Sequence, residues 1–101
     1  MGRFAPSPSG RMHLGNLYAG LLAWVRAKSK GGRILLRIED LDPLRCPKSF
    51  AYQIIEDLQW LGLPFDNDNA IVWQSDRSRI YEQYAERLRA AGLTYPCFCS
   101  R

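Results

Sequence analysis

The sequence lacks the features that would indicate a membrane or secreted protein. None of its uninterrupted apolar runs approaches the roughly 20 residues that a membrane-spanning helix requires. Its N-terminus has no basic segment followed by the apolar core of a secretory signal peptide. Three cysteines form an odd set, which suits thiol or metal chemistry in a reducing compartment better than a disulfide framework. These absences lead us to expect a cytoplasmic protein.

The sequence also lacks a cluster of basic residues. Lys and Arg are dispersed, with no run longer than two, although the net charge is +4 and the pI is near 9.2. Such a charge allows a polyanionic partner without identifying one. The composition, with 47% hydrophobic and 24% charged residues, is that of a globular protein, and 101 residues suffice for one domain or for part of a larger one.

Short apolar runs predict three strands, at residues 3–5, 34–38 and 70–73. Longer stretches with helical periodicity separate and follow these runs. The alternation predicts an α/β fold with parallel strands, flanking helices and right-handed βαβ connections.

Helical periodicity together with helix-ending residues sets the limits of three helices. The predicted limits are Leu14 to Gly31, Pro47 at the first helical position to Gly62, and Ser75 or Ser78 as N-cap to Gly92. The first helix is expected to bury the face formed by Leu14, Leu17, Tyr18, Leu21, Leu22 and Val25. The second is expected to bury Ala51, Ile54, Ile55, Leu58 and Leu61.

Two polar segments fall at the carboxyl ends of the predicted strands, where ligands of parallel α/β sheets bind. One is the turn PSPSGRMHLGN at residues 6–16, and the other is the acidic EDLD at residues 39–42. The turn contains the only histidine, His13, just before the first predicted helix. A helix start offers unpaired N–H groups and a positive dipole end, so the sequence predicts a phosphate-binding pocket here.

Two common nucleotide-binding motifs do not match this turn. Gly10 and Gly15 have the spacing of a P-loop, but Asn16 and Leu17 occupy the positions of its Lys and Ser or Thr, and the third glycine of a dinucleotide fingerprint is absent. His13 and Asn16 can nevertheless donate hydrogen bonds to phosphate oxygens, while Gly15 lets a flat ring approach the backbone. The spacing alone leaves open the alternative that His13 only caps the helix and Gly15 only eases packing.

Several segments, in order along the chain, resemble the class I aminoacyl-tRNA synthetases of the glutamyl branch. They are RFAPSPSGRMHLGN, LLRIEDLDPLR, LQWLGLPFD, WQSDRSRIYEQYAERL and GLTYPCFCSR. Residues 13–16 resemble the HIGH motif of that family, with Asn16 in place of its second histidine. The resemblance implies a Rossmann-like catalytic domain. Residues 1–93 would form its N-terminal half, and residues 94–101 would begin a truncated insertion that binds zinc and the tRNA acceptor stem.

The resemblance also implies roles for single residues. The glutamate pocket would be lined by Arg3, Phe4, Ala5, Pro6 and Ser7, with Glu39 holding the α-ammonium group. His13 and Asn16 would be catalytic and would contact the ATP phosphates, and Gly15 would let adenine stack closely. Cys97 and Cys99 would be two of the about four ligands of a structural zinc. L-glutamate, ATP with Mg²⁺, and tRNA would be the partners.

Each of these residues also has a structural alternative. Arg3 can form a surface salt bridge, Ser7 can be a turn residue, and residues 39–42 can form a solvated acidic loop. Cys97 and Cys99 can be two free surface thiols, because one pair separated by a single residue is a weak metal signal. The functional interpretation gains its weight from the whole set falling at one edge of the sheet.

Within the branch, HLGN followed by LYAGLLAW, and IEDLDP with Leu41 in place of Thr, resemble the glutamyl-Q tRNA(Asp) synthetases. This implies activation of L-glutamate to glutamyl-adenylate without tRNA, and its transfer to the queuosine of tRNA(Asp). The first alternative is the N-terminal part of a glutamyl-tRNA synthetase, which generally needs tRNA for activation and charges the 3′ end. The second is a non-catalytic nucleotide- or RNA-binding module. The Lys-rich second signature of the family is not in the chain, so the isolated chain is expected to be catalytically weak or inactive.

Overall fold

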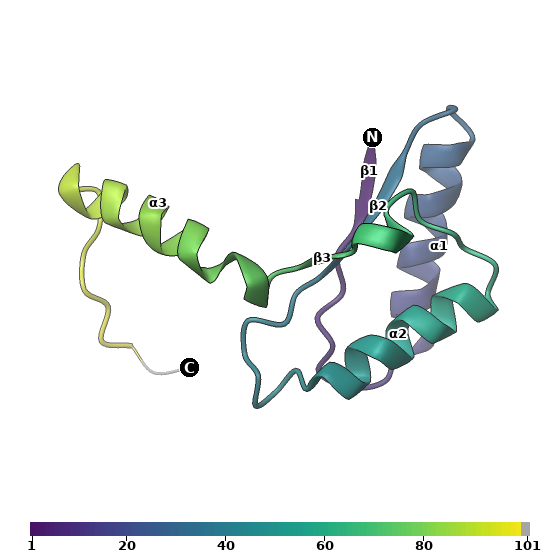
Figure 1. Ribbon diagram of the computed structural model, residues 1–101, viewed down its shortest axis with the longest axis horizontal. Helices are drawn as coiled ribbons and strands as arrows, with labels where there is room; N and C mark the ends of the chain where they lie inside the picture. The colour runs from purple at the N-terminus through teal and green to yellow at the C-terminus, as the bar shows by residue number, and fades with distance from the viewer. Residues whose placement is uncertain (100–101) are drawn as a thin grey trace.

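The fold is a three-stranded parallel sheet covered on one face by two helices (Figure 1). The computed structural model describes residues 1–99. The strands are β1 (Gly2–Phe4), β2 (Ile34–Ile38) and β3 (Val72–Trp73), with β2 in the centre. Helix α1 (Leu14–Lys28) joins β1 to β2, and α2 (Lys48–Trp60) leads from β2 toward β3. This arrangement confirms the predicted α/β fold with parallel strands and flanking helices.

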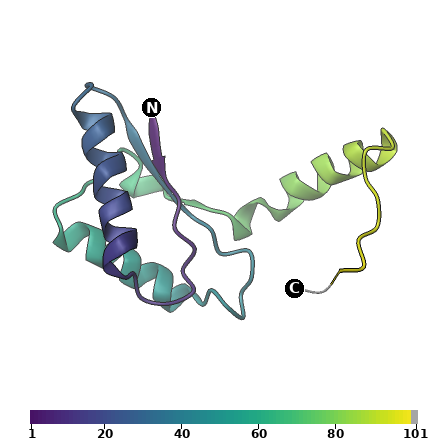
Figure 2. The same ribbon diagram turned by 180° about the vertical axis from the view of Figure 1, so that it is seen from behind.

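The remaining elements follow α2. Two short 3₁₀ turns, η1 (Asp68–Ala70) and η2 (Ser75–Arg77), flank β3, and α3 (Ser78–Ala90) comes next. Helix α3 extends away from the sheet and from the other two helices (Figures 1 and 2). Within residues 1–99, no helix has both the length and the apolar character that crossing a membrane would demand.

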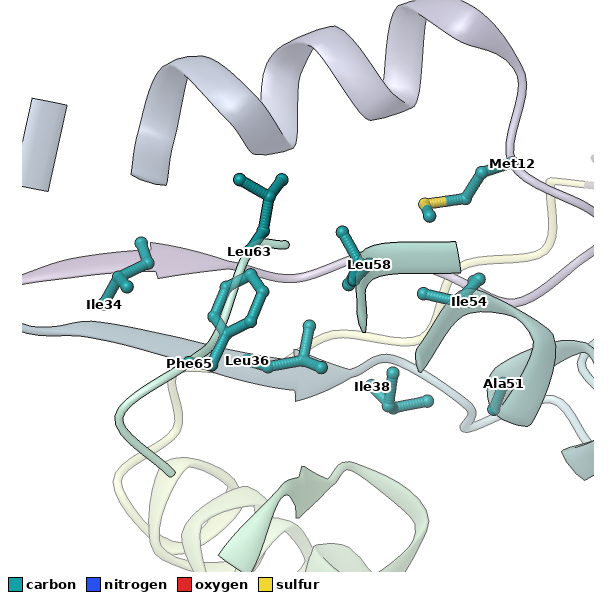
Figure 3. Packing of buried hydrophobic residues seen from close by; sticks show 9 residues of the cluster. All are labelled: Met12, Ile34, Leu36, Ile38, Ala51, Ile54, Leu58, Leu63 and Phe65. Atoms are coloured by element: carbon teal, nitrogen blue, oxygen red, sulfur yellow. The ribbon is translucent and has the colours of Figure 1, made fainter. Parts of the chain in front are cut away.

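The core lies between β2 and the two helices (Figure 3). Alternation along β2 directs Ile34, Leu36 and Ile38 toward the helices, and each is at most 1% exposed. Helix α2 packs on them through most of the face that the sequence predicts: Ala51, Ile54 and Leu58 are buried and Ile55 is half-buried. The prediction is wrong for Leu61, which is the C-cap and is 39% exposed. Met12, Leu63 and Phe65 complete the cluster from the connecting segments.

The predicted buried face of α1 is wrong. Leu14, Tyr18, Leu21, Leu22 and Val25 are 41–81% exposed, and only Leu17 of the predicted set is half-buried. The helix instead approaches the sheet through its small residues and Trp24: Gly20 is buried, and Ala23, Trp24 and Ala27 pack against the core. A Cβ at Gly20 would come within 3.2 Å of the Phe4 ring, so a small residue is needed for this close approach. Counting large apolar side chains misses such a contact.

Several predicted boundaries also differ from the structure. Strand β1 covers Gly2–Phe4 rather than residues 3–5. Strand β3 starts at Val72 rather than at residue 70, because η1 occupies the preceding residues. Pro47 is the N-cap of α2 rather than its first residue. The N-cap of α3 is Arg77, which makes no side-chain cap bond, whereas Ser78 donates its hydroxyl to the carbonyl of Ser75.

Asp66 and Asn67 take the place of a neighbouring strand along the part of β2 that β3 does not reach. The Ile34 N–H donates to the Asp66 carboxylate at 2.6 Å, and the Asp66 N–H donates to the Ile34 carbonyl at 2.9 Å. The Asn67 amide accepts from the Leu36 N–H and donates to the Leu36 carbonyl, both at 2.9 Å. These bonds satisfy backbone groups that burial would otherwise leave unpaired.

The same segment also holds α1. The Trp24 indole N–H donates to the Pro64 carbonyl at 2.8 Å, and the Lys28 ammonium pairs with the Asp66 carboxylate at 2.8 Å. Hydrogen bonds from the Lys28 side chain and the Ile34 N–H lower the pKa of Asp66 below its usual range. Residues 64–67 therefore connect the first helix to the central strand.

We predict that Asn67→Ala lowers the free energy of unfolding by about 1–3 kcal/mol, because the buried N–H and C=O of Leu36 lose their partners. Urea unfolding measures the change. Asn69→Ala is the matched control, since Asn69 is exposed and makes no side-chain hydrogen bond within residues 1–99, and it should change stability by less than about 0.5 kcal/mol. Equal effects of the two substitutions would contradict the strand-like role of Asn67.

Candidate active site

The loop between β1 and α1 is fixed at the carboxyl edge of the sheet. The Glu39 N–H donates to the Pro6 carbonyl at 3.0 Å, which attaches the loop to the end of β2. Pro6 and Pro8 are buried, whereas Ser7 and Ser9 are exposed. The alternating prolines and serines therefore direct the prolines inward and the hydroxyls outward.

Two adjoining hollows lie on either side of these serines. The first, the helix-side hollow, has a volume of about 370 Å³ and is lined by Phe4, Ala5, Pro6, Ser7, Ser9, Asn16 and Ala19. The second, the acidic hollow, has a volume of about 340 Å³ and is lined by Ser7, Ser9, Glu39, Leu41, Asp42, Arg45 and Cys46. The structure therefore gathers most of the predicted glutamate-site residues, with Asn16 and Glu39 on opposite sides of a shared serine ridge.

Two of the predicted site residues contribute differently. The Phe4 ring stacks on Phe65 with 6.5 Å between ring centroids, so the ring belongs to the core contact beneath α1. Arg3 lines neither hollow and instead lines a separate depression beside Arg26 and Lys30.

His13 is exposed and is the N-cap of α1. Its Nδ1 accepts a hydrogen bond from the Gly15 N–H at 3.1 Å, and its carbonyl accepts from the Asn16 N–H at 3.0 Å. Two of the four N–H groups that a helix start leaves without intrahelical partners are thus already used. Binding of an anion at this helix start would therefore depend more on the side chains than on the backbone N–H groups from which the sequence predicts a phosphate pocket. His13 is absent from the lining of both hollows.

The two residues before His13 hold the start of α1 in place. Met12 is buried in the core, and Arg11 pairs with Asp57 of α2 at 3.3 Å. The helix start is therefore anchored to both the core and the second helix.

The acidic residues divide into one buried carboxylate and two that line the acidic hollow. Asp40 is 4% exposed and accepts from the N–H and the hydroxyl of Ser75, at 3.0 and 2.7 Å. Asp42 accepts from the N–H groups of Leu44 and Arg45, both at 3.2 Å. Glu39 is half-buried and pairs with Arg37. Glu39 and Asp42 are therefore the acids of this segment that face a hollow, and Glu39 shares its charge with Arg37.

Cys46 lines the acidic hollow as a buried thiol. Burial raises its pKa, and the neighbouring Asp42 and Asp40 carboxylates act in the same direction. A thiol held in its protonated form is a poor nucleophile, which favours a packing role for Cys46.

Cys97 and Cys99 are exposed in the segment after α3. Hydrogen bonds from the backbone N–H and the side chain of Cys99 lower the pKa of Cys97 and favour its thiolate, the form that binds metals. Among residues 1–99, however, no three His, Cys, Asp or Glu residues are grouped as a metal site would require. The two thiols fit half of a tetrahedral zinc site. Residues 100–101 of the predicted insertion lie outside the described residues.

Comparison with known proteins places the chain in a family. The family model for the catalytic domain of class I tRNA synthetases (E and Q) matches residues 1–101, and the chain belongs to this family. The chain is 48% identical over 99% of its length to the glutamyl-Q tRNA(Asp) synthetase of Symbiobacterium thermophilum and covers 33% of that protein. It is 44% identical over 97% of its length to the glutamate–tRNA ligase of Aquifex aeolicus and covers 20% of it.

A solved structure agrees with the fold. The glutamate tRNA ligase from Elizabethkingia meningosepticum, in complex with its amino acid, superposes with a TM-score of 0.80 at 37% identity, over 87% of this chain and 19% of that one. The chain thus has the Rossmann-like fold of the class I catalytic domain and spans about a third of the length of its glutamyl-Q relatives.

We predict that Asp40→Ala lowers the free energy of unfolding by about 1–3 kcal/mol, because it leaves the N–H of Ser75 without its partner. Glu39→Gln removes the negative charge while keeping an acceptor for Arg37, and should change stability by no more than about 1 kcal/mol. Urea denaturation of both variants measures the difference. A loss from Glu39→Gln as large as that from Asp40→Ala would show that Glu39 is also a structural carboxylate.

Proposed function

We propose that these residues form part of the active site of a synthetase that activates L-glutamate with ATP and transfers the glutamyl group to tRNA. The observation that carries the proposal is the pair of hollows that share Ser7 and Ser9, with Asn16 on one side and Glu39 on the other. They lie at the carboxyl edge of a parallel sheet, where ligands of such folds bind. Membership of the class I family supplies the reaction class.

Glutamate would bind at the serine ridge. Glu39 would hold the α-ammonium group, and the Ser7 hydroxyl and the backbone of residues 4–6 would contact the rest of the amino acid. The Arg3 guanidinium suits the side-chain carboxylate of the substrate, because its fork of donors matches two oxygens. Its exposed side chain would have to turn from the depression beside Arg26 toward this edge.

Activation needs no nucleophile from the protein. A carboxylate oxygen of glutamate attacks the α-phosphorus of ATP in line, the bond to pyrophosphate breaks, and the pair of electrons leaves on the pyrophosphate oxygen. Negative charge on the phosphate oxygens is stabilised by positioned donors, here the imidazole N–H of His13 and the amide of Asn16. Mg²⁺ enters as part of the ATP substrate, and Gly15 leaves room for adenine.

Zinc would have a structural role in the whole protein. Cys97 and Cys99 would supply two thiolate ligands, and two further ligands would have to come from other parts of the protein. Such a site stabilises the fold around it and takes no part in the reaction.

The acceptor that we propose is the queuosine of tRNA(Asp). The residues of HLGN and IEDLDP support this choice, and Leu41, where glutamyl-tRNA synthetases more often have Thr, lines the acidic hollow. Relatives with the glutamyl-Q name are 44–53% identical to the chain. Glutamate–tRNA ligases are 44–47% identical, so the 3′ end of tRNA is the second candidate acceptor.

We predict that His13→Asn in the whole protein slows glutamate-dependent exchange of pyrophosphate into ATP by about 10²-fold, because one phosphate donor is lost. Asn is a strong N-cap residue, so the thermal midpoint should be unchanged. His13→Ala should lose the same activity and in addition about 1 kcal/mol of stability. Wild-type exchange by His13→Asn would contradict the role of the imidazole.

The acceptor is tested with the whole protein and radiolabelled glutamate. We expect exchange without any tRNA, and labelling of tRNA(Asp) that carries queuosine but not of the same tRNA made by transcription. Labelling of tRNA(Glu) at its 3′ end, with exchange only when tRNA is present, would instead establish the glutamyl-tRNA synthetase alternative. ATP binding without any pyrophosphate exchange would instead support the non-catalytic nucleotide- or RNA-binding module.

A further inference from the structure

The hydrogen bond at the start of α1 fixes the position of a proton on His13. The Gly15 N–H can only donate, so the Nδ1 atom that receives it at 3.1 Å must carry a lone pair. A neutral imidazole has one protonated nitrogen and one free nitrogen. The proton of neutral His13 must therefore be on Nε2.

Gly15 allows this contact because it leaves space for the imidazole ring, and its backbone conformation is not the reason. A Cβ at residue 15 would lie 2.9 Å from Cε1 of His13, closer than real Cβ atoms approach, and 3.1 Å from Nδ1, a tight contact. The glycines with positive φ are Gly31, Gly62 and Gly92, so the conformation of Gly15 is open to any residue. A side chain at residue 15 would clash only with the imidazole of His13, which folds back over Gly15.

We propose that Gly15 is a positioning residue that holds His13 as an Nε2–H donor for an anionic oxygen. The identity of that oxygen, a phosphate oxygen of ATP, rests on the proposed function, whereas the placement of the proton does not. A free imidazole exchanges its proton between two nitrogens and rotates, while the capped ring presents one donor in one orientation. Such preorganised donors are the ones that stabilise developing charge effectively. This role differs from making room for adenine.

The placement of the proton is tested by NMR, and the single histidine of the chain makes the result unambiguous. Two-bond proton–nitrogen correlations are recorded on the ¹⁵N-histidine-labelled chain at about pH 8, where an ordinary imidazole is neutral. We expect the nitrogen that couples to both carbon-bound ring protons to have a pyrrole-like shift, and the other to be pyridine-like. A pyrrole-like Nδ1, or the averaged shifts of free histidine, would overturn the proposal without any variant.

Gly15→Ala should move the two nitrogen shifts toward each other, because the ring leaves the cap. Gly10→Ala is the matched control in the same loop, since no atom lies within 4 Å of its added Cβ and its φ is not positive. It should leave the pattern unchanged. An unchanged pattern in Gly15→Ala would show that the glycine does not position the ring.

A double-mutant cycle in the whole protein tests whether Gly15 acts through His13. Gly15→Ala should lower pyrophosphate exchange by up to about 10²-fold, and should cause no further loss in a His13→Asn background. If the losses of the two single variants multiply in the double variant, Gly15 has an independent role beside adenine, and the positioning role is overturned. A wild-type protein with the expected nitrogen shifts but no exchange would refute the proposed function while leaving the proton placement established.

Discussion

The hydrogen bond from the Glu39 N–H to the Pro6 carbonyl is the constraint on which the candidate site depends. It attaches the loop after β1 to the end of β2, so that two segments more than thirty residues apart share one edge of the sheet. With the prolines buried, the serines of the loop form a ridge between the two hollows. The buried Met12 and the pair between Arg11 and Asp57 then fix the start of α1 beside that ridge.

The number, type and order of the three strands and the three α-helices followed from hydrophobic spacing, although only β2 and α2 bury the periodic face that the spacing marks. The orientation of α1 did not follow, since it depends on Gly20 fitting against Phe4, and a small residue carries little weight in a hydrophobic pattern. The edge of β2 was equally unpredictable. Asp66 and Asn67 occupy a polar turn in the sequence, and only the fold shows that their side chains replace a strand.

For the site, the meeting of Ser7, Asn16 and Glu39 could be predicted, because the carboxyl ends of parallel strands lie at one edge. The different roles of Asp40 and Glu39 could not be predicted. The Asp40 carboxylate accepts hydrogen bonds from Ser75, a residue 35 positions later, and nothing in EDLD itself separates Asp40 from Glu39. The cap made by His13 was one of two alternatives left open by the sequence, and the structure shows that it leaves Nε2 available for a second partner.

Residues 64–67 join elements that are distant in sequence, since they bond Trp24 and Lys28 on one side and Ile34 and Leu36 on the other. Opening this segment would release the first helix and uncover the backbone of the central strand in a single event. Amide hydrogens of α1 and β2 should consequently exchange as one cooperative unit rather than independently. The edge of the sheet that carries the candidate site is thus connected to a short stretch of chain that lines neither of its two hollows.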